Sequence, residues 1–329
     1  MRSLSHPFIA TLVTLNCLLT ANMSHAQRAG NYPNKPIAIV TNGAAGGSSD
    51  FINRIVAAKL GEQLGQQIVV ENITAGRGVV AAQRVAKAPP NGYTLLGVTS
   101  SSVVTSAVTP EIFPVSFRTS YMPITNFVTQ PYVMVVNAAL PVKSVRELVA
   151  LAKSKPGVLN FASLGTGSTA HLGMELFRSL AGIDIHHIPY KGTDQAEFSL
   201  VTGESNILLG GSASSGPFMK SGKTRGLAVT SSKRSKIFPD LPTLVELGYP
   251  EIEVEAWFGL MATGGTPADI VQTLHTESVR VLNLPDVLEK ILARGVDVAP
   301  SDSPADFGRR IARELDTWEG VMKKSGIKL

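Results

Sequence analysis

Residues 36–64 read PIAIVTNGAAGGSSDFINRIVAAKLGEQL, and this stretch decides the fold class. Pro36 to Thr41 is a short β-forming run, and the glycine-rich turn after it predicts a helix capped by Ser48 or Ser49. The apolar side chains that follow have the period of a helix with one buried face. They are Ile52, Ile55, Val56, Leu60 and Leu64, and Gly65 ends the helix.

Strands and helices continue to alternate along the chain. Residues 67–71 predict a strand, 79–88 a helix and 93–98 a strand, which completes the β-α-β-α-β unit of an open, mostly parallel sheet. A second set of strands and helices repeats the pattern between residues 132 and 230. A long strand at 253–262 and three helices follow, and they predict a return of the chain to the first half.

We therefore predict an α/β fold with two doubly wound domains around a cleft. A chain of 329 residues suits two domains. The first comprises residues 27–127 and 251–329, and the second comprises residues 128–250. More than one crossing between the domains makes a hinge, so the cleft can open and close.

The composition excludes several classes of protein. Hydrophobic residues make up 44% and charged residues 17% of the chain, which is typical of a globular protein and not of a disordered one. The net charge of +5 comes from scattered lysines and arginines, without the basic patch and aromatics of a nucleic-acid-binding surface. Beyond the N-terminus no apolar run reaches the roughly 20 residues of a membrane-spanning helix, which excludes a polytopic membrane protein.

Residues 1–26 have the pattern of a cleaved export signal. Arg2 precedes an apolar run from Phe8 to Ala21, and Ser24-His25-Ala26 places small residues before a cleavage site after Ala26. We therefore expect an exported protein; an anchored N-terminal helix and a lipoprotein attached through Cys17 are the alternatives. Cys17 is the only cysteine, so the mature chain has no disulfide, thiol nucleophile or cysteine metal ligand.

Four loops rich in glycine or hydroxyl groups follow predicted strands. They begin at Gly43, Thr99, Ser163 and Gly210, and two fall in each predicted domain. In open α/β sheets ligands bind at the carboxyl ends of the strands, where backbone N–H groups and positive helix ends attract anions. Strong acids and bases are few in these loops, so we expect them to hold an anionic ligand rather than transform it.

Motifs for other chemistries are incomplete. Residues 165–170 match Gly-x-Gly-x-x-Ala, but the acid that a dinucleotide ribose needs is missing at the end of the next predicted strand. No Gly-x-Ser-x-Gly motif occurs, and His186 and His187 are adjacent on a predicted strand, where they face opposite ways. We expect no cofactor and no metal. A hydrolase or dehydrogenase that uses the same cleft is the alternative from the enzyme class.

Eight short motifs occur in order over the whole mature chain. They are YPNKP at 32–36, GGSSD at 46–50, VVEN at 69–72, NGYTLL at 91–96, LPVKS at 140–144, PYKG at 189–192, LAVT at 227–230 and WFGL at 257–260. Their order and spacing resemble the substrate-binding proteins of tripartite tricarboxylate transporters, also called Bug receptors.

The resemblance implies a periplasmic protein of the Venus-flytrap, type II periplasmic-binding-protein architecture. Such a protein captures a small organic anion, a mono- or dicarboxylate, by domain closure and delivers it to the inner-membrane subunits of a transporter. We expect a monomer, with no nucleic acid as a partner. A sensory receptor that presents its closed form to a signalling partner is the alternative.

The resemblance also places the grip on the carboxylate. The first glycine loop and the Ser163 to His171 loop hold it from opposite domains, partly through backbone groups and water, and the other two loops and Lys191 extend the site. The expected ligand-binding residues are Gly46, Gly47, Ser48, Asp50, Thr99, Ser100, Ser101, Ser163, Thr166, Gly167, Ser168, Thr169, His171, Lys191, Gly210 and Gly211.

Two loops depart from the family's pattern. Residues 41–45, Thr-Asn-Gly-Ala-Ala, stand where the family usually carries Pro-Phe-x-Pro, which predicts a smaller and more flexible wall. Gly210 and Gly211 stand where it often carries Asp-Asn, whose acid could pair with a ligand ammonium. We therefore expect more space at this loop and a ligand that is not an amino acid.

Overall fold

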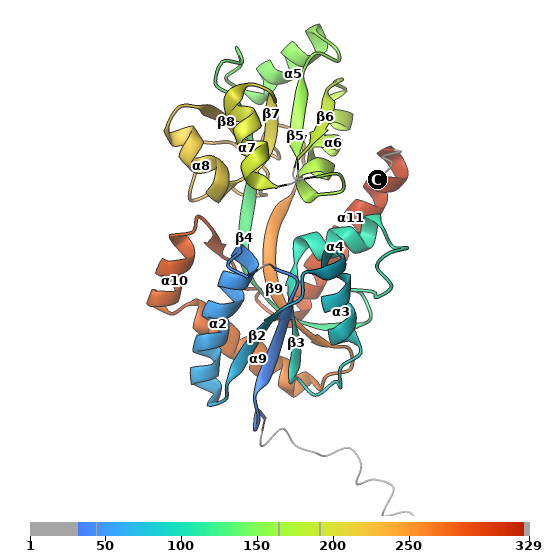
Figure 1. Ribbon diagram of the computed structural model, residues 1–329, viewed down its shortest axis with the longest axis vertical. Helices are drawn as coiled ribbons and strands as arrows, with labels where there is room; N and C mark the ends of the chain where they lie inside the picture. Colours follow the sequence, from blue (N-terminus) through green and yellow to red (C-terminus); the bar gives the residue numbers. More distant parts are fainter. Residues whose placement is uncertain (1–31, 44, 164, 191, 326–329) are drawn as a thin grey trace, which may run out of the picture.

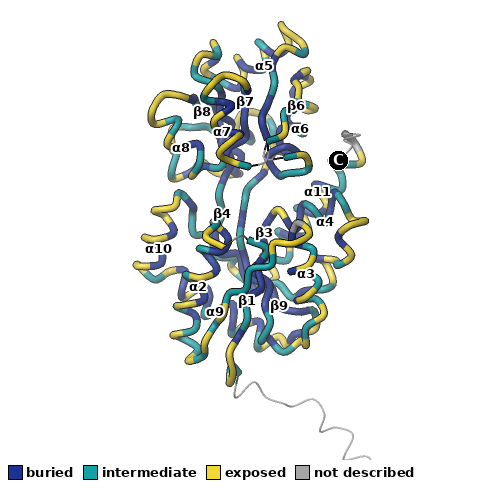
Figure 2. The backbone as a smooth tube through the Cα atoms, in the orientation of Figure 1, coloured by how far each residue is buried: buried dark blue, intermediate teal, exposed yellow. Residues whose placement is uncertain are grey.

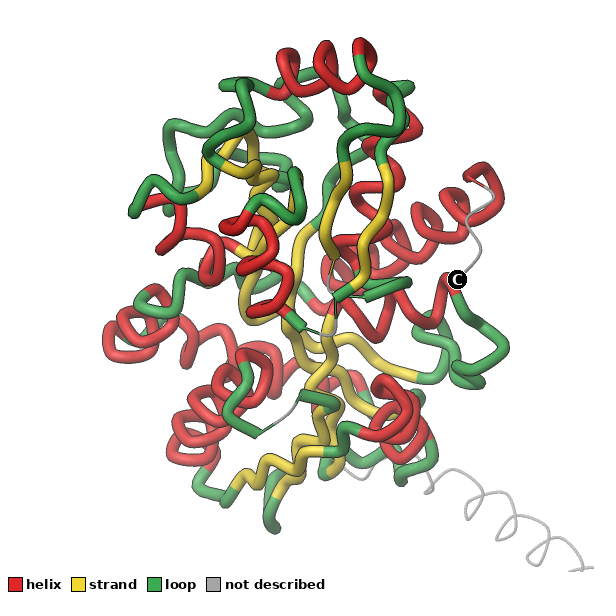
Figure 3. Tube along the Cα trace, turned by 45° about the horizontal axis from the view of Figure 1, so that its top comes forward, coloured by secondary structure: helices red, strands yellow, loops and turns green. Residues whose placement is uncertain are grey.

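The computed structural model describes residues 32–43, 45–163, 165–190 and 192–325 of the chain. Its strands form one bent sheet with the order β2-β1-β3-β9-β4-β7-β5-β6, and β8 and β10 pair with β4 outside this path. Figure 1 shows β4 and β9 at the waist of the molecule, and the tilted view in Figure 3 shows strands running through it. The strands are β1 (Ile37–Thr41), β2 (Ile68–Asn72), β3 (Thr94–Thr99), β4 (Tyr121–Asn137), β5 (Asn160–Ser163), β6 (His186–Pro189), β7 (Ile207–Gly211), β8 (Thr224–Val229), β9 (Glu255–Thr263) and β10 (Asp297–Val298).

Strand β4 belongs to both halves of the sheet. Its residues 121–131 pair with β9, and its residues 132–137 pair with β7 and β8. We call the half with β1, β2, β3, β9, β10 and residues 121–131 lobe I, and the half with β5 to β8 and residues 132–137 lobe II. This change of partner falls a few residues after the predicted boundary between residues 127 and 128; the domain limits themselves stay a prediction.

The two lobes repeat one arrangement. In lobe I, β1 is parallel to β2 and β3, and in lobe II, β5 is parallel to β6 and β7. Each lobe also holds a strand that crosses from the other lobe and runs antiparallel to its neighbours, β9 in lobe I and the second part of β4 in lobe II. The predicted doubly wound, mostly parallel units are thus confirmed. The strands that run against the parallel set are β9 and β10 in lobe I and the second part of β4 in lobe II. The carboxyl ends of the parallel strands point toward the waist, so the loops after them lie between the lobes (Figure 1).

Helices cover both faces of each half sheet, and the strands inside are the most buried segments (Figure 2). In lobe I, α2, α9 and α10 pack on one face and α3, α4 and α11 on the other. The helices are α2 (Ser48–Leu64), α3 (Val79–Ala86), α4 (Ser100–Val108), α5 (Val145–Ser154), α6 (Thr169–Ala181), α7 (Thr193–Thr202), α8 (Ser212–Lys220), α9 (Ala268–Leu282), α10 (Pro285–Leu292) and α11 (Pro304–Ser325), with a 3-10 turn at Ala75–Gly78.

The second part of β4 shows how strand alternation builds the core. Tyr132, Met134 and Val136 pack in the apolar cluster that continues through α6 and α11, whereas Val133 and Val135 pack on the other face against α7. The first cluster also contains residues of lobe I, so one core runs through the waist on the side of α6 and α11.

The start of β4 differs from the sequence prediction. The strand begins at Tyr121, whereas the β-forming pattern predicts a strand only from Tyr132. Pro123 and Pro131 lie within it, and two register shifts interrupt its pairing with β9. Prolines and bulges break the period-two pattern by which a strand is recognised, which is why the sequence hides this half of β4.

Three helix starts also differ. Helices α4 and α8 begin at Ser100 and Ser212, within segments that we expected to be loops, because serine-rich sequence has low helix propensity. The cap of α2 is Gly47, so the prediction of Ser48 or Ser49 as the cap is wrong.

Thr230 ties the two crossing segments together. It is fully buried; its N–H donates to the Tyr132 carbonyl at 2.9 Å, and its hydroxyl oxygen accepts the Tyr132 N–H at 3.0 Å. The hydroxyl group donates to the Val254 carbonyl, and the Val254 N–H donates to the Thr230 carbonyl at 3.1 Å. Residue 230 therefore links β4 to the segment that leads into β9, where both pass the waist.

Thr230→Val should lower the free energy of unfolding by about 1–3 kcal/mol, because it leaves a buried backbone N–H and a buried carbonyl without their partner. Urea unfolding followed by circular dichroism measures the change. Thr230→Ser keeps the hydroxyl group and should lose much less. Equal stability of the valine variant and the wild type would show that the hydroxyl group does not join the crossings.

Candidate functional site

The loop after β1 folds back onto the first turn of α2. Thr41 Oγ1 lies 3.1 Å from Ser49 Oγ and accepts the Gly43 N–H at 3.2 Å. A Cβ atom at Gly43 would lie 2.8 Å from the Ser49 Cβ, so glycine is needed for this close approach. Gly46 and Ser48 are exposed, which leaves the loop and the positive end of α2 open to an anion.

Asp50 holds this loop in shape. Its buried carboxylate accepts the Gly46 N–H at 2.9 Å and an Asn72 amide hydrogen at 2.8 Å, and it pairs with Arg54 at 2.9 Å. Burial raises the pKa of Asp50, but hydrogen bonds from Arg54, Gly46 and Asn72 outweigh burial and hold this pKa below its usual value. Asp50 therefore has the geometry of a positioning residue, and its direct contact with a ligand stays a prediction.

Thr99 caps α4 and joins the two loops of lobe I. Its Oγ1 atom accepts the Ser102 N–H at 3.3 Å and lies 2.9 Å from Ser101 Oγ. The same hydroxyl donates to Asn42 Oδ1 at 3.5 Å, which brings together the loops after β1 and β3. Ser101 is the exposed hydroxyl of this group.

Ser100 and Asn42 change the predicted set of residues. The hydroxyl of Ser100 is buried and accepts the Trp257 N–H of β9 at 3.3 Å, so it anchors α4 to the crossing strand. Asn42 is half-buried and belongs to the lobe I loops, although the sequence analysis did not select it. The position of Asn42 directly after β1 could have indicated this role, because loops at the carboxyl ends of the strands meet at one edge of the sheet.

Helix α6 of lobe II starts from a turn that favours glycine. Gly165 and Gly167 have φ angles of +108° and +80°, in the left-handed region. The hydroxyl of Ser168 caps the helix by accepting the His171 N–H at 3.2 Å, and the Gly167 N–H donates to His171 Nδ1 at 3.1 Å. The first turn of α6 carries no acidic residue, so its positive end is not offset.

Two stacked imidazole rings, those of His171 and His187, pack against this loop. The ring centroids of His171 and His187 are 3.9 Å apart, and His187 Nε2 lies 2.6 Å from Ser163 Oγ. Burial and the charge of Arg178 lower the pKa of His171 to about 4, and burial and the charge of His171 lower the pKa of His187 to about 4. Both rings are neutral at pH 7, so the support of the loop contributes no cation to the site.

The space beside the loop after β7 is occupied by side chains. A Cβ atom at Gly210 would lie 1.9 Å from Ser215 Oγ and 2.7 Å from Glu197 Oε1. The expectation of more space at Gly210 and Gly211 is therefore wrong, because side chains from α7 and α8 occupy the volume that a side chain would need. Ser212 at the start of α8 donates its hydroxyl hydrogen to the Gly295 carbonyl of lobe I at 2.9 Å, which places this loop where the lobes meet.

The predicted residues thus form two groups, one on each lobe. Helices α4 and α6 are in contact, but no hydrogen bond between described residues joins the first glycine loop to the Ser163–His171 loop. Lys191 lies outside the described residues. Lobe I carries Gly46, Gly47, Ser48, Asp50, Thr99, Ser100 and Ser101, and lobe II carries Ser163, Thr166, Gly167, Ser168, Thr169, His171, Gly210 and Gly211.

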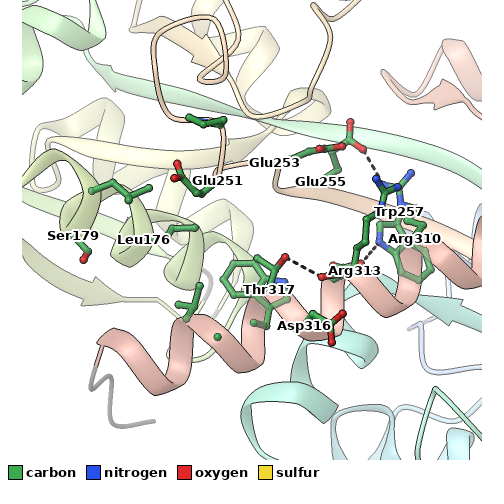
Figure 4. Close-up of a pocket in the computed structure, with 16 residues that line it drawn as sticks. Leu176, Ser179, Glu251, Glu253, Glu255, Trp257, Arg310, Arg313, Asp316 and Thr317 are labelled. Atoms are coloured by element: carbon green, nitrogen blue, oxygen red, sulfur yellow. Dashed lines mark hydrogen bonds and ion pairs between the residues drawn. The ribbon is translucent and has the colours of Figure 1, made fainter.

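One hollow lies beside the lobe I group, and a second lies at the hinge. Gly46 and Asp50 line one of about 400 Å³ between α2 and α10. The other is a cavity of about 510 Å³ between the C-terminal half of α6, helix α11 and residues 250–257 of the crossing segment (Figure 4). None of the sequence-predicted residues lines the second cavity, so we treat it as a feature of the hinge.

A buried carboxyl group stands at this hinge cavity. Trp257 Nε1 donates to Glu314 Oε2 at 2.6 Å. Arg310, on the same helix as Glu314, pairs with Glu255 at 2.8 Å (Figure 4). Burial raises the pKa of Glu314 to about 7, against the opposing effects of hydrogen bonds from Trp257 and Trp318 and of the charge of Arg310. Glu314 therefore changes its charge near neutral pH, beside a strand that crosses the waist.

The described part of the chain contains no group of three or more His, Cys, Asp or Glu residues that could hold a metal ion. None of its helices is long and apolar enough to cross a membrane.

Solved structures show the class to which this fold belongs. An R. palustris protein solved with adipate has a TM-score of 0.75 and 32% identity to this chain, and the match covers 90% of this chain and 99% of that one. MatC of Rhodopseudomonas palustris, solved with bound malate, has a TM-score of 0.71 and 29% identity, with 88% and 99% covered. The fold is that of the periplasmic binding proteins.

Sequence comparison identifies the family. BugT of Bordetella pertussis is 35% identical over 316 residues, which cover 95% of this chain and 96% of BugT. The family model described as "Tripartite tricarboxylate transporter family receptor" matches residues 52–327. The chain belongs to this receptor family, as the sequence motifs predicted. The family consists of solute receptors of transporters, so the hydrolase and dehydrogenase alternatives are set aside.

The ionisation of Glu314 should be visible in tryptophan fluorescence. The chain has two tryptophans, Trp257 and Trp318, and both interact with this carboxyl group. As the pH rises through about 7, Glu314 loses its proton and the emission should change with a midpoint near that pH. Because the carboxyl group of an unfolded glutamate titrates near 4.5, this group lowers the free energy of unfolding as the pH rises from about 4.5 to 7.

Glu314→Gln is the control, because it keeps an oxygen that accepts the indole N–H of Trp257 but has no carboxyl group that titrates. A fluorescence midpoint near 7 that persists in this variant would assign the transition to another group.

Proposed function

We propose that the protein captures a small carboxylate between its lobes in the periplasm and delivers it to the membrane subunits of a tripartite tricarboxylate-type transporter. In this proposal residues 1–26 direct export and are removed after Ala26. The units that close on the ligand are the predicted domains, 27–127 with 251–329 and 128–250. The mature chain acts as a monomer.

The start of α6 is the observation that carries the proposal. Ser168 and Thr169 follow a turn of left-handed glycines in which Thr166 is exposed and Gly167 and Ser168 are half-buried, so no bulky side chain covers the start of the helix. The helix end is positive, has no acid in its first turn, and rests on neutral histidines. Such a site suits an anion of modest charge that is bound by hydrogen bonds rather than by a salt bridge.

Lobe I supports the same chemistry from the opposite side. Helix α4 begins with hydroxyl-bearing residues and also lacks an acid in its first turn, and Ser101 is exposed there. The first glycine loop adds N–H groups at the start of α2. Relatives solved with adipate and with malate support a carboxylate as the ligand class.

Closure couples the two groups of residues. A carboxylate that bonds to both lobes binds the closed state better than the open state and shifts the population toward closure. Each charge-assisted hydrogen bond contributes roughly 1.5–3 kcal/mol. Three or four of them, offset by the costs of association and closure, reach micromolar affinity, about −8 kcal/mol.

Ser168→Ala combined with Thr169→Ala should weaken carboxylate binding by roughly 2–4 kcal/mol, because the proposed grip assigns one hydrogen-bond donor to each residue. Isothermal titration calorimetry measures the affinity, and circular dichroism checks that the variant is folded. Ser179→Ala, on the exposed end of the same helix, is the matched control and should bind like the wild type. Unchanged affinity in the folded double variant would move the site away from α6.

A thermal-shift screen tests the function itself. The mature protein is unfolded and refolded to remove any bound ligand, and then mixed with mono-, di- and tricarboxylates, aromatic acids, amino acids and nucleotides. A ligand at 100 times its dissociation constant stabilises the fold by about 2.7 kcal/mol, which raises the melting temperature by several degrees. A shift with one class of carboxylate is the expected result. A shift with nucleotides alone, or with nothing in the panel, contradicts the proposal.

A further inference from the structure

Helix α7 carries a buried carboxyl group that the proposed grip does not use. Glu197 is 2% exposed, and its Oε1 atom accepts hydrogen bonds from Ser214 Oγ at 2.9 Å and from Ser215 Oγ at 2.5 Å. Its Oε2 atom is buried and has no hydrogen-bond partner among the residues that the structure describes. A buried carboxyl oxygen without a donor is costly, so this group requires an explanation.

The carboxyl group takes the place of a side chain at the end of β7. Because a Cβ atom at Gly210 would lie 2.7 Å from Glu197 Oε1, the carboxyl group stands directly against the backbone of that loop. The loop itself contains no acid, yet an acid from a neighbouring helix lies at the same point. The sequence around Gly210 therefore does not reveal that the acidic side chain of Glu197 lies in this part of lobe II.

This cluster lies next to the surface where the lobes meet. Gly211 is paired with Tyr132, at the point where β4 changes lobes. One residue further, the Ser212 hydroxyl donates to the Gly295 carbonyl of lobe I. A Cβ atom at Gly295 would lie 3.3 Å from the Ala213 backbone, so the two lobes are in close contact here. The loop from Gly211 to Ser214 therefore borders the contact between the lobes.

Ser214 connects the buried acid to that surface. Its hydroxyl group is half-buried, and its one hydrogen is directed to Glu197 at 2.9 Å or to the Gly211 carbonyl at 3.0 Å. In either arrangement the hydrogen is used inside the protein and the oxygen lone pairs remain. Toward a ligand, Ser214 is therefore an acceptor, in contrast to the donors at the start of α6.

The charge at this end of the site depends on whether Glu197 is ionised. Burial, with a smaller contribution from the charge of Asp194, raises the pKa of Glu197, while hydrogen bonds from Ser215 and Ser214 lower it. An ionised Glu197 repels a second carboxylate and attracts a proton donor. In its neutral form it still leaves Ser214 as an acceptor.

The geometry points to Glu197 as a positioning residue that, through Ser214, makes the α8 end of the site select a ligand with a hydrogen-bond-donating group, a hydroxyl or an ammonium, in addition to its carboxylate. This inference rests on the proposed carboxylate-receptor function and names the ligand class more narrowly. It admits an amino acid as the ligand, contrary to the expectation drawn from Gly210 and Gly211 alone.

Two matched ligand series test the selection in the mature wild-type protein. Succinate, malate and aspartate share one carbon skeleton and differ at a single position by hydrogen, hydroxyl or ammonium; adipate, 2-hydroxyadipate and 2-aminoadipate do the same at greater length. In at least one series, calorimetry should give about tenfold or tighter binding for the hydroxy or amino acid than for the unsubstituted acid. The preferred substituent tells whether the group is a hydroxyl or an ammonium.

Variants then assign the selection to this cluster. Glu197→Gln and Ser214→Ala should each reduce the preference to within about threefold, mainly by weakening the substituted acid. Glu204→Gln, an exposed glutamate of lobe II, is the matched control and should keep the preference. Ser214→Ala leaves the buried carboxyl group in place, so it tests the inference even if Glu197→Gln does not fold.

The outcomes separate the two proposals. Equal affinities within both series, in a protein that binds carboxylates, overturn this inference and leave the receptor function intact. A variant that weakens all members of a series equally shows a structural role for Glu197 and also overturns it. Failure of every carboxylate in the thermal screen overturns the receptor function, and this inference with it.

Discussion

The hydroxyl group of Thr230 bonds to the backbone of both chain segments that cross the waist of the molecule. This contact matters because the two lobes share strand β4 and are otherwise joined through few segments. On one side of the waist a continuous apolar core runs through α6 and α11, and on the other side the lobes meet at the Ser212–Gly295 hydrogen bond. The crossing segments are hydrogen-bonded to each other, the lobes share a core on one side, and they are joined by fewer contacts on the other. This asymmetry is a physical basis for hinge closure.

The crossing also decides where chemistry can occur. Because each lobe directs the carboxyl ends of its parallel strands to the waist, the starts of α2, α4, α6 and α8 lie near one another. Their charges are not equal: Asp50 lies in the first turn of α2, Glu197 stands against the first turn of α8, and α4 and α6 carry no acid in theirs. We therefore propose that a carboxylate binds at the starts of α4 and α6 and that the end near α8 receives a different group of the ligand.

Much of this arrangement could be predicted from the sequence, and the exceptions have identifiable causes. Glycine-rich turns after apolar runs predicted the α/β units, and the order of eight motifs predicted the family. The first half of β4 was missed because prolines and bulges disturb its alternation, and the starts of α4 and α8 because serine is a weak helix former. The role of Glu197 could not be predicted in this way, because it depends on a contact with Gly210, thirteen positions further along the chain. A glycine carries no side chain whose chemistry would indicate such a contact.

A crystal structure of the refolded protein with the tightest-binding carboxylate tests the central claim most directly. The account predicts that the carboxylate oxygens accept hydrogen bonds from N–H or hydroxyl groups at the start of α6 and, at the same time, from the loops of lobe I. A carboxylate bound by lobe I or lobe II alone would contradict it. So would a carboxylate paired with Arg310 or Arg313 in the hinge cavity, because recognition would then depend on a salt bridge at a different place in the fold.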